Sequence, residues 1–251
     1  AIEPDLICFS SVISACEKDG QWEQALKLLD EAQERGLRLD VTAFSATISA
    51  CEKAGQLEPA LQLLKRMELL GVMPNVVTFG AVINACEKVN QWETALTLYA
   101  QMQRRGLEPD YPCFTSIMRV LRNCGQWEAA FSLLEDMKRR GILPTVPVFS
   151  SAIEACEKGG QAQMAGQLLD EIRQRGLEPS FDCYAAVLRS FVRAEEWDRA
   201  LGIIDQIGDE VLEPSREDSE EDVRRGDFHD VRRLCLEGDW EFALRTLEEM
   251  Q

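Results

Sequence analysis

The five residues SACEK at positions 14–18 return unchanged at positions 49–53, one interval of 35 residues later. The related stretches NACEK at 84–88 and EACEK at 154–158 change only the first residue, and they keep the same spacing or twice that spacing. A fixed internal period is typical of repeat proteins, in which each unit packs on its neighbours. The period therefore determines the fold class before separate domains are considered.

Each unit carries two helical patterns. In the first unit Phe9, Ile13 and Cys16 are spaced as one face of a helix, and a second pattern begins at Trp22. In most units a glycine and then a proline end the second pattern. After a repeat tail at residues 1–5, we predict six complete units at residues 6–40, 41–75, 76–110, 111–145, 146–180 and 181–215.

A single helical hairpin cannot bury both of its apolar faces, so neighbouring units must stack. An alanine recurs in the second helix, where two helices would touch closely: Ala25, Ala60, Ala95, Ala130, Ala165, Ala200 and Ala243. The tryptophans Trp22, Trp92, Trp127, Trp197 and Trp240 share another column and are predicted to anchor the core. The predicted fold class is all-α, a right-handed superhelical solenoid of stacked antiparallel helix-turn-helix repeats. Residues 216–223 are predicted to be an acidic linker, and residues 224–251 a partial seventh repeat.

The sequence shows no arrangement of residues that is typical of a catalytic site. The cysteines fall mostly in columns of the repeat rather than in metal-binding pairs, so we expect them to pack as small apolar residues in a reducing compartment. His229 is the single histidine and lacks a partner for general base catalysis. We expect no catalytic residue, metal, cofactor or small-molecule substrate, and no membrane span, because Gly71 and Pro74 break the longest uncharged stretch.

The formal net charge is −17, which opposes binding to a polyanion. Much of the excess lies at one end, since residues 195–251 carry 19 acidic and 7 basic side chains. Salt screens such a distant charge beyond about 8 Å at physiological ionic strength. Screening reduces the repulsion from that end, but Glu17, Glu52, Glu87 and Glu157 each stand directly before a lysine. We therefore expect binding to nucleic acid to be weaker and more sensitive to salt than is usual for a protein that binds it.

Several stretches together resemble the pentatricopeptide repeat family of 35-residue helical hairpins. They are VVTF at 76–79 opening a unit, Ala54-Gly55 at the turn, and GLEPD at 106–110 closing a unit. The resemblance implies a module without chemistry of its own that binds single-stranded RNA in organellar transcript processing, maturation or stability. It also implies a mitochondrial or chloroplast protein, whose targeting segment is not within this chain.

In that family one repeat reads about one nucleotide through its fifth and thirty-fifth residues. Carried onto this chain, the base-reading pairs are Ser10 with Asp40, Ser45 with Asn75, Gly80 with Asp110, Thr115 with Thr145, Ser150 with Ser180, and Ala185 with Ser215. By resemblance the first two pairs prefer guanine and then adenine, whereas the others depart from common combinations. The second residue of each repeat packs against the base, and Ile7, Thr42 and Val77 are expected to do so, whereas Pro112, Pro147 and Asp182 are unusual there.

A column of cations ends the first helix of most repeats: Lys18, Lys53, Lys88, Lys158 and Arg193. It resembles the lysines with which the family contacts the RNA backbone, and one charge per repeat suits one phosphate per nucleotide. A cation at a helix C-terminus is also stabilising by about 0.3–1 kcal/mol without any ligand. Both roles are compatible, and the sequence does not choose between them.

Two alternatives stay open at this point. A solenoid that holds a protein partner rich in Lys or Arg would suit the acidic charge and the irregular base-reading pairs. A repeat array can also precede a nuclease domain, as in protein-only RNase P, in which case the catalytic domain would lie outside this segment.

Overall fold

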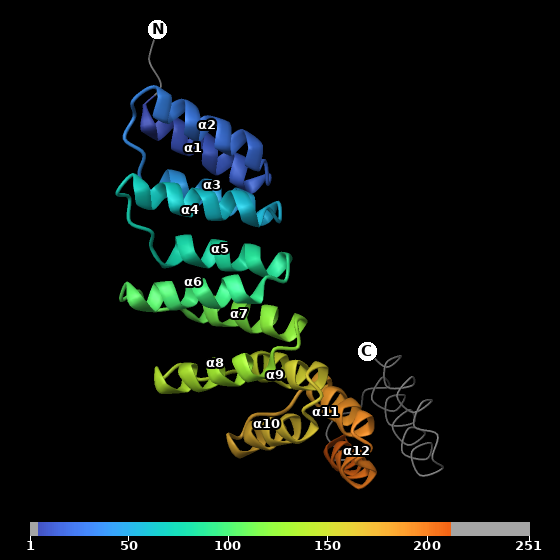
Figure 1. Ribbon diagram of the computed structural model, residues 1–251. Helices are drawn as coiled ribbons and strands as arrows, with labels where there is room; N and C mark the ends of the chain where they lie inside the picture. Colours follow the sequence, from blue (N-terminus) through green and yellow to red (C-terminus); the bar gives the residue numbers. More distant parts are fainter. Residues whose placement is uncertain (1–4, 212–251) are drawn as a thin grey trace. The chain divides into compact units, whose positions relative to one another are not determined.

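The computed structural model describes residues 5–211, with side chains up to residue 206, and every regular element in that range is an α-helix (Figure 1). The helices follow one another in antiparallel pairs: α1 (Leu6–Lys18) with α2 (Trp22–Glu34), α3 (Val41–Lys53) with α4 (Leu57–Leu69), α5 (Val76–Lys88) with α6 (Trp92–Arg104), α7 (Tyr111–Asn123) with α8 (Trp127–Arg139), α9 (Val146–Lys158) with α10 (Ala162–Gln174), and α11 (Phe181–Arg193) with α12 (Trp197–Val211). The prediction of an all-α fold of stacked helix-turn-helix repeats is confirmed. The predicted linker at 216–223 and partial repeat at 224–251 lie outside the described residues.

The turns explain where the helices stop. Gly36 follows α2 with φ of 74° and Gly71 follows α4 with φ of 73°, in the left-handed region that glycine tolerates best. Within each hairpin the corresponding turn residue is a glycine in most repeats, but Asn90 (φ 55°) and Glu195 (φ 58°) occupy the same conformation. These two side chains depart from the glycine pattern without changing the path of the chain.

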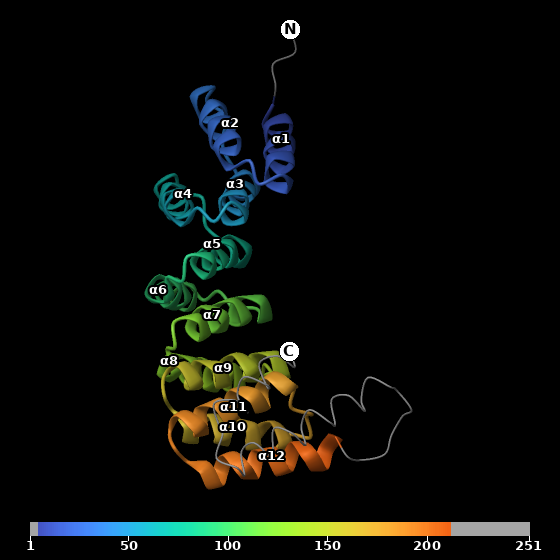
Figure 2. The same ribbon diagram turned by 90° about the vertical axis from the view of Figure 1, so that its right-hand side faces the viewer.

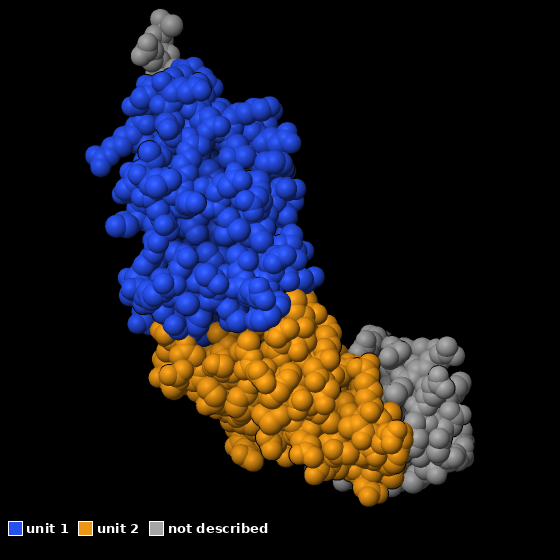
Figure 3. All heavy atoms as spheres, in the orientation of Figure 1, with its two compact units in different colours: residues 1–120 blue, residues 121–251 orange. Residues whose placement is uncertain are grey.

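Two compact units, residues 1–120 and 121–251, divide the chain within α7 (Figure 3). In the N-terminal unit the first helices of successive repeats pack on one another, α1 on α3 and α3 on α5, and each second helix also contacts the first helix that follows. Figure 2 shows α2, α4 and α6 in one layer and α1, α3 and α5 in another. Phe44 of α3, Phe79 of α5 and Phe114 of α7 are fully buried, and Phe9 of α1 is 6% exposed.

The C-terminal unit repeats this packing scheme. Helix α9 contacts α8, α10 and α11, and α11 contacts α12. Phe149 of α9 takes the place of the buried phenylalanines of the N-terminal unit. The tryptophans are less buried than predicted: Trp22, Trp92 and Trp127 are half-buried and Trp197 is 38% exposed. They border the core, because each begins a second helix on the outer side of its hairpin.

The cysteine columns pack as predicted within the described repeats. Cys51, Cys86 and Cys156 are buried, and desolvation raises the pKa of the Cys51 thiol to about 11 and that of Cys86 to about 12. Such thiols stay protonated and behave as apolar groups. Cys8, in the first described helix, is exposed instead. None of the described helices combines the length and apolar character needed to cross a bilayer.

Candidate nucleic-acid interface

The second residue of every described repeat lies on the surface at the start of a first helix. Ile7 is 74% exposed and Val77 is 65% exposed, and Thr42 is also exposed. Pro112, Pro147 and Asp182 occupy the same exposed position in the later repeats. An apolar β-branched side chain held in water on a regular array is available to pack against a planar ligand. The predicted base-packing residues therefore have the accessibility that their role requires.

The thirty-fifth residues of the first three repeats are N-caps of the helices that follow them. One carboxylate oxygen of Asp40 accepts the Ala43 amide proton at 2.9 Å, and Asp110 accepts that of Cys113 at 3.0 Å. Asn75 uses its amide oxygen in the same way toward Thr78 at 2.9 Å. Such caps contribute about 1 kcal/mol each and hold the side chain in one orientation. In Asp40 and Asn75 the other polar atom is left for a ligand, whereas the Asp110 carboxylate also interacts with the Cys113 thiol.

The fifth residues face the same side of the first helices but differ in accessibility. Ser10, Ser45, Gly80 and Thr115 are half-buried, whereas Ser150 is 9% exposed and Ala185 is 1% exposed. The Ser10 hydroxyl oxygen is itself buried, although the residue is half-buried as a whole, and it has no hydrogen-bond partner among the described residues. The side chains nearest to solvent at this position therefore belong to the earlier repeats.

The third residue of the next repeat contacts both members of the predicted base-reading pair formed by Ser45 and Asn75. Ser45 Oγ is 2.9 Å from Thr78 Oγ1, and Thr78 Oγ1 donates to Asn75 Oδ1 at 3.0 Å. The next pair shows the same neighbourhood, since a Cβ added to Gly80 would lie 3.5 Å from Cys113 Sγ. The structure thus places the fifth and thirty-fifth residues of these repeats side by side. Sequence reasoning missed the third residue, whose only signal was a hydroxyl at a position otherwise occupied by Ala, Cys or Val.

The later pairs are built differently. Thr145 and Ser180 begin α9 and α11 without a side-chain cap hydrogen bond to the helix. The Ser180 hydroxyl lies 3.3 Å from Cys183 Sγ, and its partner Ser150 is buried. Ser215, the predicted partner of Ala185, lies outside the described residues. The C-terminal unit therefore offers hydroxyl groups where the N-terminal unit offers carboxylates and an amide.

The lysine column of the N-terminal unit is engaged between neighbouring repeats. Lys53 Nζ lies 3.2 Å from a Glu17 carboxylate oxygen, and Lys88 Nζ lies 3.0 Å from one of Glu52. Lys88 also donates to the backbone carbonyls of Glu52 at 2.7 Å and of Lys53 at 3.2 Å. Lys88 thus stabilises the C-terminus of α3 as well as that of its own helix, whereas Lys53 is joined to the last turn of α1 through the Glu17 side chain alone. Lys18 makes no ion pair with any described residue.

The C-terminal unit joins its repeats through a buried carboxylate. Both oxygens of Glu157 accept from Arg189 at 2.9 Å, and Arg193 adds a third contact at 3.2 Å. Glu157 is 8% exposed and the Arg189 side chain 18%, so this pair is largely desolvated, whereas Arg193 reaches it from the surface. Lys158 is exposed and forms no ion pair within the described part of the chain. Among the predicted backbone contacts, Lys18 and Lys158 are thus the least engaged, and Arg193 is held by Glu157.

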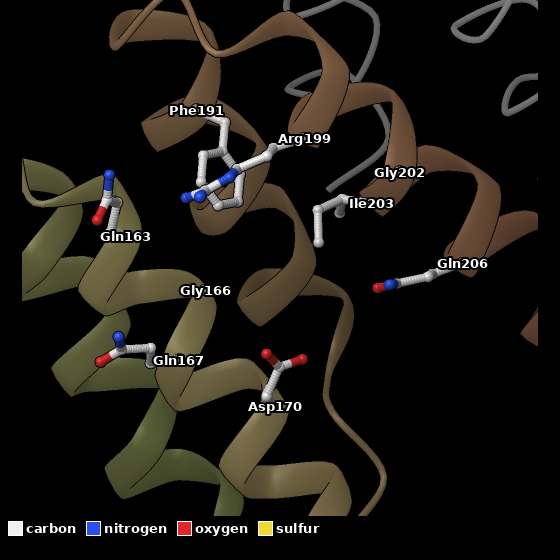
Figure 4. Close-up of a pocket in the computed structure, with 9 residues that line it drawn as sticks. All are labelled: Gln163, Gly166, Gln167, Asp170, Phe191, Arg199, Gly202, Ile203 and Gln206. Carbon is white, nitrogen blue, oxygen red and sulfur yellow. The ribbon is translucent and has the colours of Figure 1, made fainter.

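A pocket of about 410 Å³ lies away from all these residues, between α10, α11 and α12 (Figure 4). The Arg199 guanidinium lies over the Phe191 ring at 5.8 Å, and the Asp170 carboxylate points into the pocket from α10. The remaining polar lining consists of glutamine amides, which neither transfer protons nor attack a substrate. No group of His, Cys, Asp or Glu among residues 5–211 is arranged to hold a metal ion.

Helical hairpins that stack every 35 residues and align polar pairs on one face define a helical-repeat protein. Models of the pentatricopeptide repeat match the chain at residues 27–88 (pentatricopeptide repeat domain), at 74–123 and 110–158 (PPR repeat family), and at 7–37 and 147–177 (PPR repeat). The chain belongs to the pentatricopeptide repeat family. No curated protein sequence matches it.

Solved structures agree with this assignment. The chain is similar to the pentatricopeptide repeat protein PPR10 in complex with an 18-nucleotide psaJ RNA element, with 25% identity and a TM-score of 0.68 over 96% of this chain and 38% of that one. The chain is also similar to PPR10 from maize, with 20% identity and a TM-score of 0.57. This match covers 99% of this chain and 39% of PPR10. Nuclear protein-only RNase P 2 from Arabidopsis thaliana shares the fold, with 16% identity and a TM-score of 0.66. This match covers 76% of this chain and 42% of RNase P 2. The chain thus spans less than half the length of these proteins.

Proposed function

We propose that this chain binds single-stranded RNA through its first-helix face and selects bases chiefly with its first two complete repeats. The observation that carries the proposal is the fixed orientation of Asp40 and Asn75. Each spends one oxygen on a helix cap and keeps its second polar atom for a ligand. The likeness to PPR10 in complex with an RNA element supports the same ligand class.

The chemistry of the free atoms distinguishes the two repeats. The second oxygen of Asp40 is an acceptor, which suits the ring N–H and amino group of guanine. The amide nitrogen of Asn75 is a donor, which suits the unprotonated ring nitrogen of adenine. The proposed preference is therefore guanine followed by adenine, read 5′ to 3′ as in the family.

The test exchanges the two cap residues in the full chain. Asp40→Asn with Asn75→Asp keeps both caps, since each new side chain retains an oxygen, but interchanges the free donor and acceptor. Binding of short single-stranded RNAs that differ only as GA or AG should reverse its preference, by about fivefold or more. Asp110→Asn is the matched control, because the partner of Asp110 is Gly80 and offers no second contact. It should change the preference least.

Two results would contradict the proposal. If the exchanged variant keeps the wild-type preference, these residues do not read bases. If the wild-type chain retains no RNA at low or at physiological salt, RNA is not its ligand, and a partner protein rich in Lys or Arg becomes the candidate for this acidic chain.

Family resemblance also suggests a cellular process and a compartment for this chain. We place the chain in transcript processing, maturation or stability in a mitochondrion or chloroplast, as a module without catalysis of its own. The fold shared with RNase P 2 keeps a nuclease array as the second candidate, in which catalysis would belong to another part of a longer protein. Imaging the full-length protein fused to a fluorescent tag would test the compartment.

A further inference from the structure

Thr78 joins the two members of the second repeat's base-reading pair. Its side chain is fully buried in the first turn of α5. Its hydroxyl oxygen is 2.9 Å from Ser45 Oγ and 3.0 Å from Asn75 Oδ1, and it also accepts the Asn75 backbone amide proton at 3.4 Å. A threonine that reads no base thus contacts both residues that do.

The number of available protons determines which atom donates and which accepts in each of these hydrogen bonds. Asn75 Oδ1 can only accept, and it already accepts from the Thr78 backbone amide at 2.9 Å, so the single hydroxyl proton of Thr78 is donated to it as well. Because that proton is used, Ser45 must be the donor in its bond with Thr78. Ser45 then presents only lone pairs to a ligand, and Asn75 presents its NH₂ group.

The other repeats have no such connection. The residues at the position of Thr78 are Ala43, Cys113, Val148 and Cys183, and none of them carries a hydroxyl group. In the first repeat the equivalents of Ser45 and Thr78 are Ser10 and Ala43, and the buried hydroxyl oxygen of Ser10 has no partner among the described residues. The hydroxyl proton of Ser10 is therefore not fixed by a hydrogen bond within the protein, whereas that of Ser45 is donated to Thr78.

We propose that Thr78 is a positioning residue that fixes which base the second complete repeat accepts. With an acceptor on Ser45 and donors on Asn75, the pair matches a base edge whose amino group lies beside an unprotonated ring nitrogen, as in adenine and cytosine. Guanine and uracil carry a proton on that ring nitrogen, which would face the NH₂ of Asn75. The inference rests on the proposed binding of RNA and assigns its specificity to a residue outside the base-reading pair.

The test uses Thr78→Val in the full chain, which removes the hydroxyl but keeps the shape, and valine already occupies this column at Val148. Affinities are compared for RNAs with adenine or guanine at the nucleotide read by the second repeat. The adenine-to-guanine ratio should fall about two- to tenfold, because Asn75 loses the bond that orients it and Ser45 regains a free proton. Thr78→Ser keeps the hydroxyl and should retain the wild-type ratio.

The variant Thr47→Val distinguishes the proposed positioning role of Thr78 from a general effect on stability. Thr47 is equally buried, and its hydroxyl donates to the Ala43 carbonyl at 2.8 Å, away from the pair. This variant should lose stability without changing the base ratio. An unchanged ratio in Thr78→Val, or an equal fall in Thr47→Val, would overturn the inference.

A second measurement does not need RNA. In the free protein, the side-chain amide signals of Asn75 in a ¹⁵N-resolved NMR spectrum should be sharp, and they should broaden or split in Thr78→Val because the amide samples more than one orientation. Unchanged signals would overturn the positioning role. If the wild-type chain retains no RNA, the proposed function fails, and this spectrum still decides whether Thr78 orients Asn75.

Discussion

The two compact units use one helical scheme but build their polar faces differently. In the N-terminal unit, Asp40, Asn75 and Asp110 cap helices with one atom and expose another, and the lysines form half-exposed ion pairs between repeats. In the C-terminal unit the fifth residues are buried and a carboxylate, Glu157, is enclosed by arginines. The same columns thus carry the proposed ligand-selecting side chains in one unit and join repeats to one another in the other.

The largest expected effect concerns the enclosed carboxylate. Glu157→Gln should lower the free energy of unfolding by about 2–4 kcal/mol, because Arg189, whose side chain is only 18% exposed, would lose the carboxylate that accepts both of its hydrogen bonds. Glu52→Gln, at the same repeat position in the N-terminal unit, should change it by less than about 1 kcal/mol, since its lysine partner is well solvated. Urea denaturation of both variants measures the contrast. Equal losses would remove the proposed difference between the units.

The next effect comes from packing between repeats. A Cβ on Gly159 would come closer to Trp127 Cδ1 than van der Waals contact allows, and would lie 3.2 Å from the Gly125 carbonyl oxygen. Gly159→Ala should therefore cost about 1–3 kcal/mol in thermal or urea unfolding. Ala54 occupies the matching helix end in the N-terminal unit, and Ala54→Gly should cost about 1 kcal/mol or less. A neutral Gly159→Ala would show that Trp127 moves freely.

A stabilising change is expected at the turn before α12. Glu195 holds a left-handed conformation with φ of 58°, so Glu195→Gly should raise the free energy of unfolding by about 0.5–1 kcal/mol. Asn90 is the matched position in the N-terminal unit. Asparagine tolerates this conformation, and Asn90→Gly should change stability by only a few tenths of a kcal/mol, roughly. Differential scanning calorimetry compares the two, and a loss of stability in Glu195→Gly would contradict the account.

The smallest expected effect is a loss of folding stability at alkaline pH. Burial raises the pKa of the Cys86 thiol to about 12 and that of the Cys156 thiol to about 11, from an ordinary value of 9.0. Below pH 9 this contribution to stability is complete, and it is lost as the pH rises from 9 toward the folded values, because the unfolded thiols ionise first. Cys86→Ala should lower stability at pH 7 yet show a shallower decline between pH 9 and 11. If stability declines with pH as steeply in this variant as in the wild type, ionisation of the Cys86 thiol does not cause the decline.

Much of the fold follows from residues that act locally. The 35-residue period, the glycines after the second helices and the apolar spacing within each hairpin are read directly from the chain, and α1 to α12 follow them. The base-reading columns came from family resemblance, and the structure shows how Asn75 is oriented as a helix cap. Glu195 could not be predicted in a left-handed turn, because sequence rules place glycine there.

Contacts between neighbouring repeats were beyond sequence reasoning. The lysine column was visible, but its partners were not, since the bond from Lys88 to Glu52 depends on how two first helices lie against each other. The contacts of Thr78 with Ser45 were hidden for the same reason, because they join residues 33 positions apart. Periodicity identifies equivalent positions, whereas the side chains that meet across an interface are set by packing.

Selection from a random pool of single-stranded RNA by the full chain tests the central claim most directly. The account predicts enrichment of a short motif in which two adjacent positions, guanine then adenine, carry the information, while the nucleotides facing the C-terminal unit carry little. Asp40→Asn with Asn75→Asp should invert that dinucleotide. Failure to retain RNA, or a motif that this double substitution leaves unchanged, would contradict the claim that the N-terminal unit selects the bases.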